Sequence, residues 1–304
     1  MNNFKILSFI QGVDGCGPAF VNKNKEIISK FKDYNDCINF LSMNGLYVNN
    51  AIKEDIISKI EDDVKLINKL SVKIITFFDD DYPSKLLDLN NQAPTILYAL
   101  GNISLLQKSS IGIIGTRNPS EISQKFERQI IEKIPKLNEK VIISGLALGC
   151  DKIAHETTLK IEKHTIAVLP NGINLVRPPQ HKELAKQIVE KNGCLLSVFP
   201  IGTQASKTTY VRRNSIIAAL SDTLLVVECG MNSGTLYTVE SSFKMNRTIG
   251  CYIPSNKTQG DFSGNEYVIK KYSGYKIDSK EALYSFINKD TKSKKEINTQ
   301  LSFL

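Results

Sequence analysis

Short apolar runs rich in β-branched residues recur through the middle two-thirds of the chain. They begin roughly 24 to 30 residues apart, which is the length of one strand plus one crossover helix. The runs show no alternation of apolar and polar positions, as is typical of strands that are buried on both faces. They occupy residues 110–115, 141–144, 165–169, 194–199, 223–228 and 248–253.

The segments between these runs have the periodicity of helices. In segment 120–134, Ile122, Phe126 and Ile130 recur every four residues. The stretches HKELAKQIVEK, RRNSIIAALS and SGTLYTVESSFKM fill three further crossovers. Strands that alternate with helices predict an α/β fold, namely an extended Rossmann-like, doubly wound and mainly parallel sheet.

The two ends of the chain differ from this middle region. Residues 1–70 are mostly helical in pattern and rich in Lys and Asn, which predicts a small helical domain of the SAM or helix-hairpin-helix kind. Residues 72–104 carry two more strand-like runs that extend the sheet, so we expect the Rossmann-like domain over 71–287. The basic segment 288–304 is expected to be a tail.

The composition favours a polyanionic partner without requiring one. The formal net charge is +8, although a solvated lysine-rich surface would give the same value. The six cysteines are scattered, several of them inside apolar runs, which predicts reduced core thiols and a cytoplasmic protein. No apolar stretch approaches about 18 residues, the start lacks the features of a signal peptide, and the three histidines lack ligand spacing. We therefore expect no membrane span, metal or cofactor.

Arginine is rare in this chain, and its positions are informative. Only six of the 39 basic residues are arginine, and two of them, Arg212 and Arg213, closely follow Tyr210. A guanidinium can hold two phosphate oxygens at once or stack on a flat ring, which an ammonium cannot do. A third arginine, Arg117, directly follows the first predicted strand.

Small residues and hydroxyls accompany these cations at the ends of several predicted strands. Ligands of an open parallel sheet bind beyond the carboxyl ends of its strands, so the loops at 115–117, 144–145 and 233–235 are expected to meet there. No G-x-G-x-x-G follows a strand, and no G-x-x-x-x-G-K-[ST] occurs, so a dinucleotide or Walker-type site is not supported. Cations spread over several loops beside a ring favour a single nucleic-acid strand.

The same loops resemble motifs of the DNA processing protein A (DprA/Smf) family. Its G-S-R motif occurs here as Gly115-Thr116-Arg117, and its S-G-x-A-x-G-x-D-x-x-A-H signature as segment 144–155. Its F-P-x-R-N-R-I-I block is similar to 210–217, and its S-G-S-L-x-T block to 233–238. The resemblance covers about 72–270 in the family's order.

This resemblance implies a Rossmann-like homodimer that binds single-stranded DNA without strong sequence preference. It also implies loading of the RecA recombinase during natural transformation. Many members of the family carry a C-terminal winged helix, but the segment after the last strand here is too short for one, so we expect no full winged helix. Leu148 and Ser215 stand where arginines are common in the family. By position, the implied DNA-binding residues are Gly115, Thr116, Arg117, Ser144, Gly145, Lys207, Tyr210, Arg212, Arg213, Asn214, Ser233 and Gly234.

Four other polar residues are interpreted as structural. Asp151 is expected to cap its helix or brace the neighbouring loop, and His155 to form hydrogen bonds in a helix that packs on the sheet. Glu228 is a candidate for holding an arginine of the pocket in place. His181 is expected on the surface.

Two other classes of function stay open at this point. One is a nucleotide-binding hydrolase like the phosphoribohydrolases, whose P-G-G-x-G-T-x-x-E motif supplies a glutamate. Here Thr238 stands at that position and Glu240 comes two residues later, about 200° around a helix, which disfavours the hydrolase. The other is a structural or interaction module, which leaves the clustered arginines unexplained. A DNA-binding pocket would also serve repair or defence.

Overall fold

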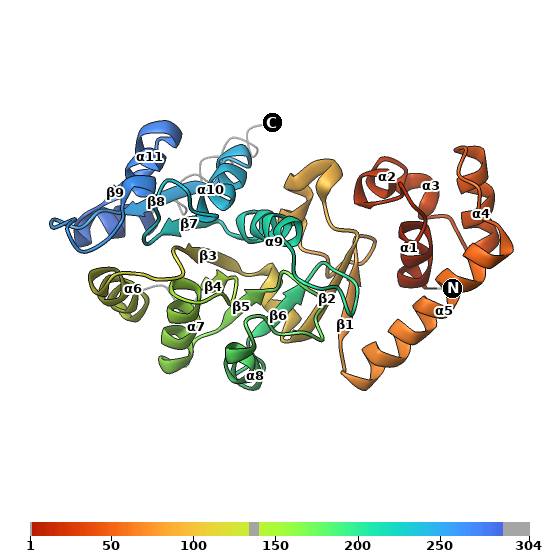
Figure 1. Ribbon diagram of the computed structural model, residues 1–304, viewed down its shortest axis with the longest axis horizontal. Helices are drawn as coiled ribbons and strands as arrows, with labels where there is room; N and C mark the ends of the chain where they lie inside the picture. Colours follow the sequence, from red (N-terminus) through yellow and green to blue (C-terminus); the bar gives the residue numbers. More distant parts are fainter. Residues whose placement is uncertain (1, 134–139, 288–304) are drawn as a thin grey trace, which may run out of the picture.

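A nine-stranded sheet organises the chain in a computed structural model that describes residues 2–133 and 140–287 (Figure 1). The strand order is β1-β2-β6-β5-β4-β3-β7-β8-β9. The pairs β1–β2 and β2–β6 are antiparallel, and all the others are parallel. The strands are β1 (Lys73–Thr76), β2 (Ile96–Gly101), β3 (Ser109–Ile114), β4 (Lys140–Ser144), β5 (Thr165–Val168), β6 (Cys194–Ser197), β7 (Thr223–Val226), β8 (Thr248–Tyr252) and β9 (Tyr275–Ile277). The predicted fold class, a doubly wound and mainly parallel sheet, is confirmed.

The strand order reverses between β3 and β7. From β3 the chain adds β4, β5 and β6 on one side, and then returns to place β7, β8 and β9 on the other. The loops that leave β3 and β7 therefore diverge at the carboxyl ends of these two neighbouring strands, which is where ligands bind in folds of this type.

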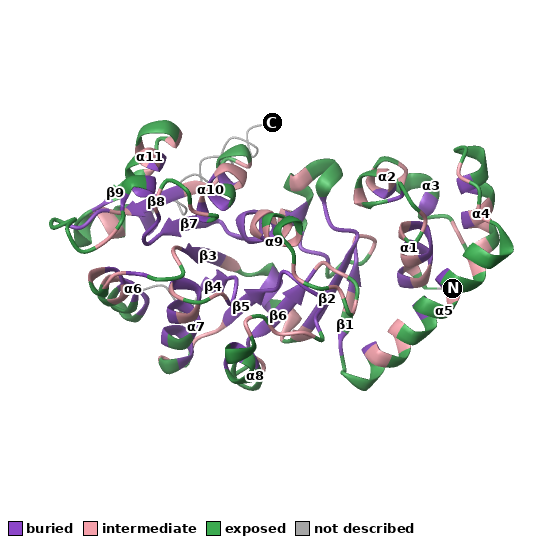
Figure 2. Cartoon of the chain, in the orientation of Figure 1, coloured by how far each residue is buried: buried purple, intermediate pink, exposed green. Residues whose placement is uncertain are grey.

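Helices cover both faces of the sheet, whose strands are mostly buried (Figure 2). Successive strand residues point to opposite layers. In β4, Val141 and Ile143 pack with one set of helices, whereas Ile142 packs with the other. One layer contains α9 (Lys207–Leu220), α10 (Thr235–Lys244), α11 (Ser263–Tyr272) and η1 (Ser84–Gln92). The opposite face is covered by α6 (Glu121–Lys133), α7 (Cys150–Lys160) and α8 (Lys182–Glu190). The short η2 (Ile103–Gln107) and η4 (Pro179–His181) lie in connections.

Five helices precede the first strand. They are α1 (Asn3–Gln11), α2 (Pro18–Lys23), α3 (Lys25–Ile28), α4 (Tyr34–Met43) and α5 (Asn50–Lys69). Asp33 begins α4 with a capping box, in which its side chain and that of Asp36 accept each other's backbone N–H groups. The expected helical N-terminal region is thus present.

The helical region and the sheet share one apolar core. Phe4 of α1 packs edge-to-face on Tyr98 of β2 with ring centroids 6.2 Å apart, and Gln11 Nε2 donates to Thr95 Oγ1 at 2.6 Å. The predicted boundary at residue 70 falls between α5 and β1, and the division into separate domains stays a prediction. The predicted basic tail, 288–304, lies outside the described residues.

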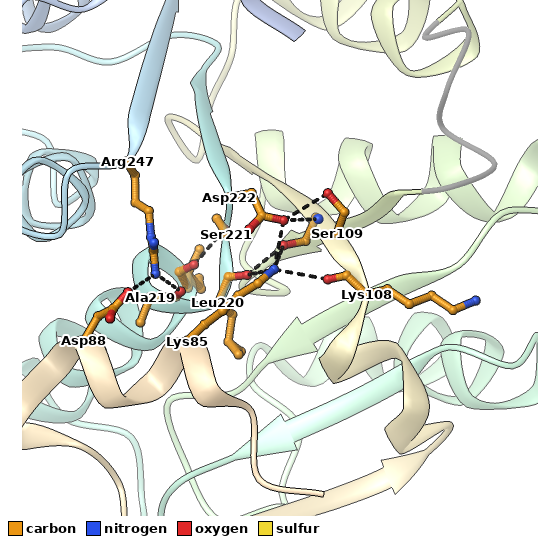
Figure 3. A network of polar contacts seen from close by, with 11 residues as sticks. Lys85, Asp88, Lys108, Ser109, Ala219, Leu220, Ser221, Asp222 and Arg247 are labelled. Atoms are coloured by element: carbon orange, nitrogen blue, oxygen red, sulfur yellow. Dashed lines mark hydrogen bonds and ion pairs between the residues drawn. The ribbon is translucent and has the colours of Figure 1, made fainter. Parts of the chain in front are cut away.

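Two cations hold η1 against the C-terminal end of α9 (Figure 3). Lys85 Nζ lies 2.8 Å from Asp222 Oδ2 and also donates to the carbonyls of Lys108 and Leu220. Arg247 Nη2 donates to Asp88 Oδ2 at 2.6 Å and to the carbonyl of Ala219 at 2.9 Å.

These contacts provide hydrogen bonds to the last carbonyls of α9, whose C-terminal turn has no basic residues of its own. The last turn of α9 carries no Lys, Arg or His, so its free carbonyls and its negative dipole end need cations from elsewhere. Lys85 and Arg247 supply them from segments distant in sequence. Asp222 also accepts the backbone N–H of Ser110 at 2.9 Å, which fixes the start of β3 to the same cluster.

Replacement of Asp222 by alanine should strongly destabilise the protein. The variant leaves the mostly buried Lys85 ammonium and the Ser110 N–H without their carboxylate partner, and loss of one member of such a pair costs about 3–5 kcal/mol. Urea unfolding monitored by circular dichroism measures the change in the free energy of unfolding. Asp55→Ala is the control, because its pair with Lys59 is exposed and contributes less than about 1 kcal/mol. Equal stability of the two variants would contradict this assignment.

Candidate nucleic-acid interface

A cavity of about 330 Å³ opens where the strand order reverses, beyond the carboxyl ends of β3 and β7. We call it the β3–β7 cleft. Its walls come from the loops after β3, β4 and β7 and from one face of α9 and α10. Eight of the twelve predicted DNA-binding residues line it: Gly115, Thr116, Arg117, Tyr210, Arg213, Asn214, Ser233 and Gly234.

Two guanidinium groups lie over the Tyr210 ring. The Cζ atom of Arg117 is 5.3 Å from the ring centroid, and that of Arg213 is 5.6 Å from it. Both distances are within the range of a cation–π attraction. Arg117 is exposed and Tyr210 is half-buried. The cleft therefore presents a flat ring beside a solvent-accessible cation.

Arg213 is buried in the floor of the cleft and is 5% exposed. Its Nη1 donates to the carbonyl of Gly145 at 2.5 Å and of Val168 at 3.3 Å, and lies 3.8 Å from Asp151 Oδ2. Burial lowers the pKa of the guanidinium, and the Asp151 carboxylate partly offsets this effect. The same Asp151 oxygen accepts the N–H of Ala147 at 3.2 Å, so the expected brace of this loop is present. Arg213 thus joins α9 to the ends of β4 and β5.

Two glycines permit this close packing of loops. A Cβ atom on Gly145 would lie 1.4 Å from Arg213 Nη1, so only glycine leaves room for the guanidinium. Gly149 has a φ of +74°, and a Cβ there would meet the carbonyl of Thr116 at 2.4 Å. Ser144 is fully buried and donates to the carbonyl of Ile113 at 2.7 Å. Ser144 and Gly145 therefore lie beneath the cleft and support it.

The N-terminus of α10 is tied to the other two walls. Thr235 Oγ1 donates to the carbonyl of Gly115 at 3.1 Å, and Asn214 Nδ2 donates to the carbonyl of Gly234 at 3.2 Å. Thr235 was not among the predicted DNA-binding residues. Its position directly after Gly234, at the start of a helix, is the signal that would have found it.

Lys207 and Arg212 lie on the other side of α9, where they line a separate groove. Arg212 Nη2 donates to the carbonyl of Gln92 in η1, and partial burial lowers its pKa. Consecutive helical residues are about 100° apart, which separates Arg212 from Arg213. Of the two arginines, Arg213 is the one at the cleft.

Two expectations for other residues are wrong. Glu228 accepts hydrogen bonds from Ser120 Oγ at 2.6 Å and from the N–H of Asp261 at 3.2 Å, and not from an arginine of the cleft. His181 is buried, because η4 packs against the loop after β4, where His181 Nδ1 lies 2.8 Å from the carbonyl of Leu146. Glu228 and His181 are both buried, and this could not be predicted from the polarity of the neighbouring sequence.

His155 packs inside α7 against the sheet, as expected. The Thr165 hydroxyl donates to the carbonyl of Ile142 and lies 2.7 Å from His155 Nδ1, so this nitrogen carries the proton and donates. The Nε2 atom has no hydrogen-bond partner among the described residues. Burial lowers the pKa of His155 to about 3.

The hydrolase alternative requires a glutamate in the cleft, and none of the described residues that line it is a glutamate. Thr238 lines the cleft, whereas Glu240 lines the separate groove and pairs with Lys244 at 2.8 Å. Among the described residues, Asp151 is the acidic side chain that lines the cleft, and it is engaged by Arg213. This arrangement supplies binding groups and no free carboxylate for acid–base chemistry.

Residues 2–133 and 140–287 contain neither a cluster of metal ligands nor a membrane-spanning helix. Within these ranges no three His, Cys, Asp or Glu side chains gather as a metal site would require. In the same part of the chain no helix has the length and apolar character needed to cross a bilayer.

The sequence matches a family model and several characterised relatives. The model described as DNA recombination-mediator protein A matches residues 73–288. Protein Smf of Synechocystis is 36% identical over 181 residues, which are 58% of this chain and 45% of that protein. DNA processing protein DprA of Streptococcus pneumoniae is 31% identical over 211 residues, 69% of this chain and 73% of that protein. The chain thus spans under half of the Synechocystis relative's length.

Two solved structures share the fold. DNA processing protein A of Streptococcus pneumoniae has a TM-score of 0.76 and 25% identity, covering 94% of this chain and 98% of that chain. A structure of DNA processing protein A from Helicobacter pylori, described for its single-stranded DNA binding mode, has a TM-score of 0.63 and 25% identity. It covers 72% of this chain and 96% of that chain. The resemblance to the DprA/Smf family is confirmed.

The two arginines beside Tyr210 should differ in their effect on stability. Arg213→Ala leaves the buried Asp151 carboxylate without its cation and removes the donor to two carbonyls, so the free energy of unfolding should fall by about 3–5 kcal/mol. Arg117→Ala removes an exposed side chain and should change it by less than about 0.5 kcal/mol. Urea unfolding of both variants measures the difference. Similar values for the two variants would mean that Arg213 does not hold the floor of the cleft.

Acid should destabilise the protein in part through His155. The unfolded chain binds a proton at this residue below pH 6.5, whereas the folded chain does so only near pH 3. The stability contributed by neutral His155 is therefore present above pH 6.5 and is lost as the pH falls toward 3, at up to about 1.4 kcal/mol per pH unit. Urea unfolding between pH 7 and 4 measures the free energy of unfolding of the protein and of His155→Gln. The difference between these two free energies should shrink as the pH falls. Parallel profiles would contradict a buried neutral histidine.

Proposed function

Because the chain belongs to the DNA recombination-mediator protein A family, we propose that it is a non-catalytic protein that binds single-stranded DNA in the β3–β7 cleft. The observation that carries the proposal is the stack of Arg117, Tyr210 and Arg213 at a reversal of strand order. Proteins that hold single strands combine cations for the phosphates with rings on which bases stack. The exposed Arg117 supplies the first and Tyr210 the second.

Each of the three groups has a distinct part in this proposal. Arg117 is exposed and can bind a phosphate with two parallel N–H groups. The half-buried Tyr210 ring, which both guanidiniums contact, is the surface proposed to stack on a base. Arg213 is already engaged by two carbonyls and by Asp151, which offsets its charge, so it holds the Tyr210 ring from the floor of the cleft.

The same geometry favours single strands over duplex. A base can stack on Tyr210 only if its face is free, and in a duplex both faces are covered by neighbouring base pairs. Phosphate contacts from Arg117 and hydroxyl contacts from Thr116 and Ser233 carry no base information. Binding should therefore depend little on sequence.

The finer part of the proposal is a role in recombination. We propose that the protein protects incoming single strands and transfers them to the RecA recombinase as a homodimer in the cytoplasm. Its support is membership of a family described as recombination mediators. The six buried, unpaired cysteines are consistent with a reducing compartment.

Fluorescence anisotropy of a labelled 30-nucleotide single strand, compared with the matching duplex at two salt concentrations, tests the proposal. The single strand should bind more tightly, with affinity falling as salt rises. Arg117→Ala should weaken binding by about 1.5–3 kcal/mol and reduce the slope of log affinity against log salt by about 0.7. The loss should be the same for homopolymers of different bases.

Tyr210→Ala provides the complementary measurement. It should cost about 1–3 kcal/mol of affinity with an unchanged salt slope, because a stacked base releases no counterion. Arg128→Ala is a matched control, since Arg128 is an arginine on α6 that does not line the cleft. Equal binding of duplex and single strand, or equal losses for Arg117→Ala and Arg128→Ala, would sink the proposal.

A further inference from the structure

A second cavity of about 680 Å³ lies across the α9–α10 pair from the β3–β7 cleft. We call it the α9–α10 groove. Its walls are the outer faces of α9 and α10 and the segment η1. Resting on the proposed function, we propose that this groove binds the continuation of the single strand after it leaves the cleft.

The groove and the cleft are built from alternate faces of the same two helices. On α9, Tyr210 and Arg213 line the cleft, whereas Lys207 and Arg212 line the groove. On α10, Thr238 lines the cleft and its neighbour Tyr237 lines the groove. A strand bound at Tyr210 therefore needs to pass only the first turn of α9, where Lys207 is exposed, to enter the groove.

The charges of the groove favour a polyanion. Its two acidic residues are neutralised, because Asp88 pairs with Arg247 at 2.6 Å and Glu240 pairs with Lys244 at 2.8 Å. Arg212 donates to a neutral carbonyl, so its positive charge is not compensated. Together with the exposed Lys207, it leaves the groove with a net positive field.

An exposed ring lines the same groove as these cations. Tyr237 is 48% exposed, and the apolar side chain of Val211, 37% exposed, is also part of the groove wall. Solvent-exposed rings beside backbone-tracking cations are the recurrent feature of single-strand sites, which span about 4–16 nucleotides. The volume of the cleft is about half that of the groove, so the groove adds most of the space in which a longer strand could bind.

The far wall of the groove is fixed in place before any ligand binds. The η1 segment is held at its start by Lys85 and in its middle by the Arg247–Asp88 pair (Figure 3). Its end is held by the contact from Arg212 to the carbonyl of Gln92. A preformed wall avoids the ordering cost that a loop would incur on binding.

Binding of oligothymidines of 6 and 20 nucleotides, measured by fluorescence anisotropy, separates the two sites. The 6-mer occupies the cleft, and the 20-mer reaches the groove as well. Tyr237→Ala should lower affinity for the 20-mer by about 5- to 100-fold and for the 6-mer by less than about 2-fold. Tyr237→Phe should keep the affinity. The matched control is Phe243→Ala, because Phe243 is on the same helix, is also 48% exposed and lines neither cavity.

A photo-crosslinking measurement gives an independent readout. A 20-mer that carries 5-iododeoxyuridine should crosslink to Tyr237, whereas a 6-mer that carries it should not. Equal affinities of wild type and Tyr237→Ala for the 20-mer, with no crosslink to Tyr237, would overturn the inference while leaving the cleft intact. Failure of the wild type to bind either length would overturn the proposed function and this inference together.

Discussion

The buried guanidinium of Arg213 is the interaction on which the geometry of the cleft depends. It joins α9 to the carboxyl ends of β4 and β5 and to Asp151 at the start of α7, so four elements from distant parts of the chain meet at one group. The guanidinium fits there only because Gly145 has no side chain. It in turn contacts the Tyr210 ring. A buried charge of this kind adds little net stability by itself, but it fixes a single arrangement of the loops, because any other would leave it unpaired.

Helix α9 carries this constraint through the molecule. Its N-terminal half separates the cleft from the groove, and its C-terminal end is held by Lys85 and Arg247 (Figure 3). The helix therefore has polar anchors at Arg213 and at its C-terminal end, and the apolar side chains from Ile216 to Leu220 pack on the sheet. Because the Arg213 contacts and the contacts from Lys85 and Arg247 all join α9 to other elements, the orientation of α9 about its axis is fixed, and with it the assignment of each residue to one cavity.

The fold was largely predictable from sequence because the hydrophobic pattern is strong. The six apolar runs became β3 to β8, and fully buried strands leave no ambiguity of face. The cleft was predictable in outline, since loops after parallel strands must meet at one edge. The roles of individual residues could be predicted less well. Ser144 lies beneath the cleft, His181 is buried, and Glu228 binds Ser120, since each depends on a loop whose path no local pattern encodes.

The sequence by itself determined the class of fold, the set of loops at the functional edge and the family to which the chain belongs. These follow from periodicity and from residue types at fixed spacings, which are local properties. The tertiary structure alone decided which of two adjacent arginines reaches the cleft, and it placed Lys207 and Tyr237 together in a second groove. The physical reason is that a helix distributes neighbours around its axis by about 100° per residue, and only packing against β4, β5 and η1 fixes how that axis is turned.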